Sequence, residues 1–166
     1  MDIKELVSKI EESSEFKEFI ASDKDSYLAN IFQIIEQGQS IWQVGYFNSQ
    51  KDKMTLFVFL DSILKVVPNQ DVFKKPGSTV EKLDLSVVSV SLDEASSKVD
   101  KIIDEKYSAM KPIKRIVILQ NQSGKTIWNF TFMAQSMPIN IRLDATNLEL
   151  ISDKKIDLID KNESFK

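Results

Sequence analysis

The chain has 166 residues and a formal net charge of −3 at pH 7, and its residues are 42% hydrophobic and 28% charged. A chain of this size can bury a hydrophobic core without covalent staples, as one domain or as two small ones. Cysteine and histidine are both absent, which excludes disulfides, thiolate metal sites, thiol nucleophiles and the commonest general base. We therefore expect a protein that is not an enzyme and needs no cofactor or metal. Catalysis by carboxylates or by Tyr46 stays open as a third hypothesis.

Charge and hydropathy also limit the expected partners. The 22 basic and 25 acidic residues are interspersed along the chain, which disfavours nucleic acid, since its binding requires basic patches. No apolar run approaches the roughly 18–20 residues of a membrane span. The first residues, Met1 to Glu5, lack the basic and apolar regions of a signal peptide. The sequence as given predicts a cytoplasmic location, and an extracellular location is the alternative if a leader has been removed.

The chain begins with a predicted helix over residues 2–21. Asp2 and Glu5 have the spacing of a capping box. Apolar residues recur with the helical period at Ile3, Leu6, Val7 and Ile10. Because Ser13-Ser14 interrupts this stripe, we expect a kink or a second short helix there.

Runs of β-branched and aromatic residues predict antiparallel strands in the rest of the first half. The expected ranges are 29–36, 40–47, 53–60 and 62–67, with the second and third joined as a hairpin. The turn Lys74-Lys75-Pro76-Gly77-Ser78 is the best candidate for a boundary. A further strand is expected over 83–90, leading into the second half.

The second half begins with a clear helix signal. Ser91 and Glu94 form a capping box, and the helix ends before Lys111-Pro112 because the residue before a proline avoids the helical conformation. Four strands are expected after it, at about 113–120, 125–135, 138–145 and 147–152. The polar tail is expected to be frayed.

Two segments of the chain look like copies of each other. Gly38-Gln39-Ser40-Ile41-Trp42-Gln43-Val44 matches Gly124-Lys125-Thr126-Ile127-Trp128-Asn129-Phe130, and the chain contains no other tryptophan. The offset is 86 residues in these segments and 83 at Leu60-Asp61 and Leu143-Asp144, which we assign to a longer first hairpin loop.

The sequence therefore predicts an α+β fold of two repeated units, each an amphipathic helix packed on an antiparallel sheet of about four strands. The expected segments are a divergent first repeat at 1–76, a linker strand at 77–90, a second repeat at 91–160 and the tail at 161–166.

The second copy resembles the PepSY domain, a small module with a helix and an antiparallel sheet. The likeness rests on the helix start Ser91-Leu92-Asp93-Glu94-Ala95, on the strand from Gly124 to Phe130, and on the ending Leu143-Asp144-Ala145-Thr146-Asn147. Asn147 stands near the family's usual glycine, and asparagine also adopts the left-handed conformation. The first copy keeps only Leu60-Asp61 of the ending. The resemblance implies a cystatin-like fold, a setting outside the cytoplasm and modulation of a peptidase.

Alternation along the strands assigns side chains to the two faces of the sheet. The expected helix-facing core contains Trp42, Val44, Tyr46, Trp128, Phe130 and Phe132, with both tryptophans as markers of the repeat. In the second half, Ile139, Ile141 and Leu143 point inward, and Asn140 and Arg142 point outward. In the first half, Leu56, Val58 and Leu60 are assigned to the core face, and Phe57 and Phe59 to the outer face.

Phe57 and Phe59 are the predicted anchors of a binding surface, because a contiguous apolar patch on a sheet marks an interaction site. Cover by the other half or by the linker strand is the alternative. Asn140 and Arg142 hold the corresponding outer positions of the second half. Asp61 and Asp144 recur after equivalent strands, and we interpret them as turn caps rather than as a catalytic pair.

These features favour a non-catalytic protein- or peptide-binding module, including modulation of a peptidase. The expected partner is a protein, a peptide, or a second copy that forms a homodimer through the sheet face of the first repeat. The alternative is a domain that binds a small apolar ligand in a pocket between helix and sheet, near Trp42 or Trp128.

Overall fold

The computed structural model describes residues 2–135 and 137–157. This part contains three α-helices and one antiparallel sheet of eight strands, which confirms the α+β class. The helices are α1 (Ile3–Glu12), α2 (Ser14–Ser22) and α3 (Leu92–Lys106). The strands are β1 (Tyr27–Glu36), β2 (Gln39–Asn48), β3 (Lys53–Leu60), β4 (Ile63–Gln70), β5 (Pro112–Gln122), β6 (Lys125–Ala134), β7 (Ile139–Asp144) and β8 (Leu150–Lys155). The predicted tail at 161–166 lies outside the described residues.

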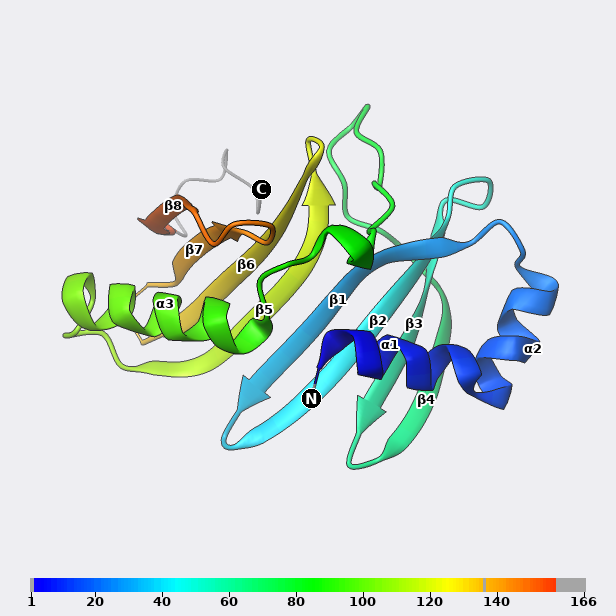
Figure 1. Cartoon of the computed structure of the whole chain (residues 1–166), viewed down its shortest axis with the longest axis horizontal. Coiled ribbons are helices and arrows are strands. Elements are labelled where there is room, and N and C mark those ends of the chain that lie inside the picture. Colours follow the sequence, from blue (N-terminus) through cyan, green and yellow to red (C-terminus); the bar gives the residue numbers. More distant parts are fainter. Residues whose placement is uncertain (1, 136, 158–166) are drawn as a thin grey trace.

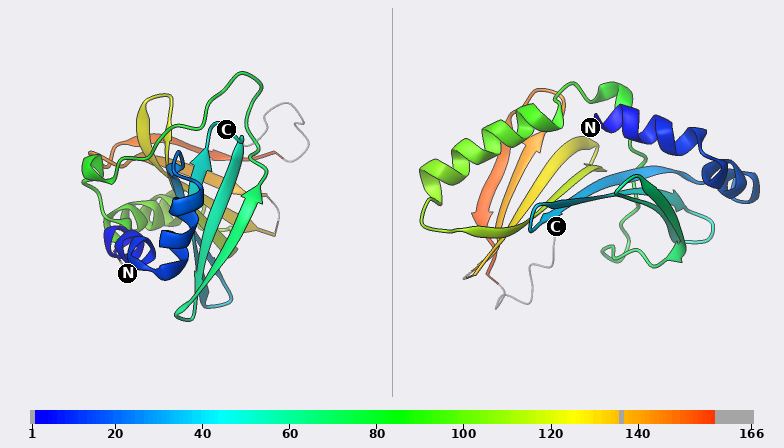
Figure 2. Two further views of the ribbon diagram at one scale, coloured as in Figure 1. Left: turned by 90° about the vertical axis from the view of Figure 1, so that its right-hand side faces the viewer. Right: turned by 90° about the horizontal axis from the view of Figure 1, so that it is seen from below.

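The strand order in the sheet is β4-β3-β2-β1-β5-β6-β7-β8. Each half of the chain contributes four consecutive strands, and the first strand of each set, β1 and β5, pair antiparallel at the centre (Figure 1). All eight strands thus share one sheet, whereas the division into segments at 76, 90 and 160 stays a prediction. The helices cover one face, with α1 and α2 over the first four strands and α3 over the last four (Figure 2).

The helices begin and end where their local sequence dictates. Ser13 separates α1 from α2, and its side chain accepts a hydrogen bond from the Phe16 N–H at 3.1 Å, which starts the predicted second helix. Ser91 and Glu94 form the predicted capping box of α3. At the start of α1, Asp2 is the N-cap residue but makes no side-chain capping bond, so the capping box predicted there is wrong.

The core lies between the helices and the helix-facing side of the sheet. Both tryptophans belong to it, with exposed fractions of 7% for Trp42 and 1% for Trp128. The apolar stripe of α1 is buried as predicted. Tyr46 ties this layer to α1, because its hydroxyl donates to Glu11 Oε1 at 2.8 Å. Burial and the Glu11 carboxylate raise the pKa of Tyr46.

The face assignment predicted for β3 is wrong. Phe57 stands opposite Val44, and Phe59 stands opposite Trp42, and directly opposite residues share a face. Phe57 is 0% exposed, and its ring centroid lies 5.5 Å from Phe16 and 5.4 Å from Phe19 of α2. Leu56 instead packs with Phe47 and Met54 on the other face.

A one-residue error in the predicted alignment explains this reversal. Leu143 is paired with Trp128 and Phe59 with Trp42, so the two strands are offset by 84 residues rather than 83. Because side chains alternate with a period of two, a slip of one residue moves every side chain to the opposite face.

Residues 83–90 do not form the predicted strand. They contain a short 3₁₀ helix, η1 (Leu85–Val87), in a connection that is bonded to β1 and to the turn after β7. The Leu83 N–H donates to Leu28 O at 2.8 Å, and the Val90 N–H donates to Ala145 O at 3.0 Å. Trp128 Nε1 donates to Val90 O at 3.0 Å. The connection therefore crosses the ends of the strands instead of lying alongside one of them.

Candidate functional site

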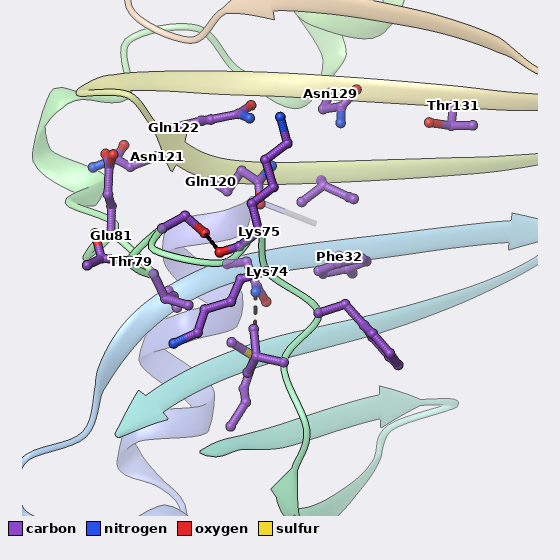
Figure 3. Close-up of a pocket in the computed structure, with 18 of the residues that line it drawn as sticks. Phe32, Lys74, Lys75, Thr79, Glu81, Gln120, Asn121, Gln122, Asn129 and Thr131 are labelled. Carbon is purple, nitrogen blue, oxygen red and sulfur yellow. Dashed lines mark hydrogen bonds between the residues drawn. The ribbon is translucent and has the colours of Figure 1, made fainter. Parts of the chain in front are cut away.

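The helix-free face of the sheet carries a groove with a volume of about 940 Å³. Its floor is formed by side chains of β1, β2, β3, β5, β6 and β7, and its wall by Gln70 at the end of β4 and by residues between 71 and 81. Lys154 and Lys155 of β8 also line it. Figure 3 shows Phe32, Gln120, Asn129 and Thr131 on the strands, with Lys74, Lys75, Thr79 and Glu81 on the crossing segment. The groove thus draws residues from both halves of the sheet.

An apolar pair lies at the centre of the floor. Phe32 of β1 stands directly opposite Ile118 of β5. On the outer sides, Gln43 is paired with Phe32 and Asn129 with Ile118. One row of side chains across four strands therefore presents two apolar groups between two carboxamides.

A buried polar cluster fixes the floor on the β6–β7 side. Asn140, Asn129 and Thr131 are only 5%, 8% and 8% exposed. Asn140 Nδ2 lies 2.6 Å from Asn129 Oδ1 and 3.1 Å from Thr131 Oγ1. Buried polar groups that satisfy one another in this way hold their side chains in one arrangement.

Asn30 lines the groove on the β1 side, where a backbone irregularity in β1 lies between Leu28 and Asn30. Its Oδ1 is buried without a hydrogen-bond partner among the described residues. Its Nδ2 faces the sulfur of Met54 at 3.5 Å, and sulfur is a weak acceptor. Gly45 leaves room for this side chain, since a Cβ at position 45 would lie 2.5 Å from Asn30 Oδ1.

The wall of the groove is anchored at both ends. At its start, Lys53 pairs with Asp71, and Lys74 pairs with Asp52. At its end, the Tyr27 hydroxyl donates to Val80 O at 2.6 Å, and the Gly124 N–H donates to Glu81 Oε2 at 3.1 Å. Between these anchors, Phe73 is 100% exposed at the rim.

The predicted binding residues are divided between the two faces. Asn140 lines the groove. Arg142 points to the same face beside it, and its guanidinium donates to Gln122 Oε1 at 2.6 Å, while burial lowers its pKa. Phe57 and Phe59 belong to the helix-facing core, so the structure does not bring them together with Asn140 and Arg142. A homodimer through the sheet face of the first half would have to use Leu56, Val58 and Leu60 instead.

The recurring aspartates have different surroundings. Asp144 Oδ1 accepts hydrogen bonds from Thr146 Oγ1 at 2.6 Å and from its N–H at 2.8 Å, which lower the pKa of Asp144. This is the predicted turn cap. Asp61 is exposed in the β3–β4 turn with a φ of 48°. Neither aspartate and neither tryptophan lines the groove.

Sequence reasoning missed Phe32, Ile118, Gln43 and Asn129 as a group. The signal was present, because Phe32 and Ile118 are separated by the same 86 residues as the tryptophans, and so are Gln43 and Asn129. Their gathering in one row depends on the pairing of β1 with β5, which no local pattern predicts.

Two features are absent from the described part of the chain, residues 2–135 and 137–157. No helix in this part is long and apolar enough to cross a membrane. No three histidine, cysteine or acidic side chains gather there in a way that could hold a metal ion.

The fold and groove define an α+β domain with helices over one face of an antiparallel sheet and a groove on the other. No protein-family model matches the sequence, and no curated protein matches it significantly. Among solved structures, the chain is similar to a "putative lipoprotein" from Clostridium difficile 630, with a TM-score of 0.55 and 11% sequence identity, over 86% of this chain and 90% of that chain. At this identity the likeness shows the fold alone.

Proposed function

We propose that the chain is a non-catalytic binding module that holds an extended segment of a protein or peptide partner in the groove of its helix-free face. The observation that carries the proposal is the composition of the floor, where Phe32, Leu56 and Ile118 lie among Gln43, Gln120 and Asn129. An uncovered concave surface that combines apolar groups with converging polar groups is typical of a binding site.

We also propose that the two halves are copies of one PepSY-like unit. The hairpin registers support this, because Gln33 pairs with Trp42 and Leu119 pairs with Trp128 at the same offset of 86. The two turns agree as well, with φ values of 51° and 79° at Gln37-Gly38 and 53° and 73° at Ser123-Gly124. A PepSY-like origin favours modulation of a peptidase as the role of this binding module.

The cellular location of the protein stays a prediction. The PepSY resemblance favours a location outside the cytoplasm.

A selection from a phage-displayed library of random linear peptides tests the proposed binding. Wild-type protein is expected to enrich peptides that lose binding to an Ile118→Lys variant, which places a charge on the groove floor. Ile113→Lys is the matched control, because Ile113 lies on the same strand, is 62% exposed and does not line the groove. Failure to enrich any peptide, or equal binding to both variants, would contradict the proposal.

A small apolar ligand is the second candidate. The groove volume of about 940 Å³ lies within the roughly 300–1,000 Å³ of small-molecule sites, but the groove is on the opposite face of the sheet from the layer near Trp42 and Trp128 where this ligand was predicted. A ligand between helix and sheet would shift tryptophan fluorescence, because both tryptophans lie in that layer. A shift across a panel of lipids and metabolites would favour this candidate, whereas peptide binding in the groove is expected to leave the emission unchanged.

A further inference from the structure

Neutral carboxamides from five strands meet in the groove: Asn30 on β1, Gln43 on β2, Gln120 on β5, Asn129 on β6 and Asn140 on β7. A carboxamide carries both a donor and an acceptor, as does each peptide unit of a main chain. Resting on the function proposed above, we infer that these side chains recognise the main chain of the bound segment. The groove then binds extended peptides mainly through their main chain, and Phe32 and Ile118 favour apolar side chains between the main-chain contacts.

Asn30 supplies the clearest acceptor for such a main chain. Its Oδ1 is one of three buried side-chain oxygens without a hydrogen-bond partner among the described residues, and Ser26 Oγ and Ser152 Oγ, the other two, do not line the groove. A buried acceptor without a partner is costly, and a peptide N–H from a ligand removes that cost. Gly45 maintains the position of this oxygen by leaving the space that a Cβ would fill.

Asn129 is held as the complementary donor. Its Oδ1 accepts from Asn140 Nδ2 at 2.6 Å within the buried cluster. This bond fixes which end of the Asn129 carboxamide is the oxygen, and it leaves the NH₂ end as the donor for a ligand carbonyl. A donor oriented before binding loses less conformational entropy when the ligand arrives.

The row across the floor sets the spacing of the contacts. Gln43 and Asn129 are separated by Phe32 and Ile118, and three strand spacings amount to about 14 Å. An extended peptide rises about 3.3 Å per residue, so roughly four ligand residues span this distance. Two main-chain contacts about four residues apart are therefore expected, with apolar contact between them.

Main-chain methylation tests this inference on a linear peptide from the library selection. Each peptide nitrogen is methylated in turn, each side chain is replaced by alanine in a parallel series, and Kd is measured by fluorescence anisotropy. We expect methylation of a peptide nitrogen that donates to Gln43 or to Asn30 to weaken binding about tenfold, as for a lost buried hydrogen bond, whereas the contact from Asn129 to a peptide carbonyl is not removed by methylation. Alanine replacement is expected to weaken binding at the apolar positions between the main-chain contacts and to change Kd less than about threefold at the other positions.

Protein variants complete the test. Gln43→Met keeps the shape of the side chain but removes the carboxamide, and it is expected to weaken binding about tenfold. Gln33→Met is the matched control, because Gln33 stands opposite Trp42 on the helix-facing side and bonds to Ser40. A peptide that binds the groove equally well when fully methylated overturns this inference and leaves the proposed function in place. A selection that yields no groove-binding peptide overturns both.

Discussion

Phe32 of β1 and Ile118 of β5 face each other across the centre of the sheet and lie 86 residues apart in the chain. Among the residues paired between β1 and β5, only Phe32 and Ile118 are related by the 86-residue offset, because antiparallel pairing changes the separation by two at each step. The groove is built over this junction, with Gln43 and Asn129, also 86 residues apart, on its two sides. Neither half alone contains the floor of the site.

The contact between Phe32 and Ile118 is expected to couple the two halves. A double-mutant cycle of Phe32→Ala and Ile118→Ala, followed by urea unfolding, should give a coupling free energy of about 0.2–1 kcal/mol, as for other cross-strand pairs. The control cycle combines Phe32→Ala with Met133→Ala. Met133 is suitable because it pairs with Lys114 further along the sheet and not with Phe32. Equal coupling in both cycles would contradict direct contact at the junction.

Phe57 is expected to be a core residue and not a binding residue. Phe57→Ala should lower the free energy of unfolding by about 3–5 kcal/mol, because it empties a site between β3 and α2 that is 0% exposed. Val58→Ala, on the opposite face of the same strand, should cost only about 1 kcal/mol. Chemical unfolding measures both. A loss below that of Val58→Ala would restore the outward orientation that the sequence predicted.

Gly45 is expected to be needed for close packing rather than for its backbone angles, since its φ is not in the left-handed region. A Cβ there would lie 2.5 Å from Asn30 Oδ1 and 2.6 Å from Met54 Sδ. Gly45→Ala should therefore destabilise the fold by about 1–3 kcal/mol, as overpacking does.

The same change in an Asn30→Ala background is expected to cost less, because one of the two clashing groups has been removed. Thermal unfolding of the single and double variants gives the comparison. An equal cost in both backgrounds would show that Asn30 does not occupy the space above Gly45.

Asp153 is expected to contribute to stability only above acidic pH. Lys106 Nζ lies 2.6 Å from Asp153 Oδ2, and the Tyr107 hydroxyl donates to Oδ1 at 2.9 Å. The Lys106 ammonium holds the pKa of Asp153 below its usual value. A carboxylate with a lowered pKa stabilises the fold above its unfolded pKa of about 3.9, and this stabilisation is lost as the pH falls below that value through the folded pKa.

The effect should not exceed about 1 kcal/mol, because the pair lies near the surface. Asp153→Asn is expected to flatten the decline of unfolding free energy between about pH 5 and pH 2. The check is urea unfolding of both proteins across that range. If the unfolding free energy depends on pH with the same slope in wild type and variant, Asp153 does not contribute to the pH dependence of stability.

The sequence predicted most of the elements because their signals are local. The capping box at Ser91 and Glu94 and the paired polar-glycine turns each lie within a few residues of chain, and the structure has them where they were expected. The orientation of Trp42 and Trp128 also followed from alternation within a single strand.

The predictions that failed depend on pairing between distant segments. The β3 faces were reversed because the Leu-Asp endings at 60–61 and 143–144 align one residue away from the true register. Residues 83–90 have an alternating pattern, but their N–H groups bond to Leu28 on β1 and to Ala145 in the turn after β7. The groove needed the β1–β5 pairing, which joins residues that are far apart in the sequence.

The location of the bound peptide is the central claim. Backbone amide chemical shifts of the isotope-labelled protein, recorded while a library-selected peptide is added, test it most directly. The account predicts shifts concentrated at Asn30, Phe32, Ile118, Gln120 and Asn129 on the helix-free face. Shifts confined to α1, α2 and α3, or to residues 63–69 of the edge strand β4, would contradict it.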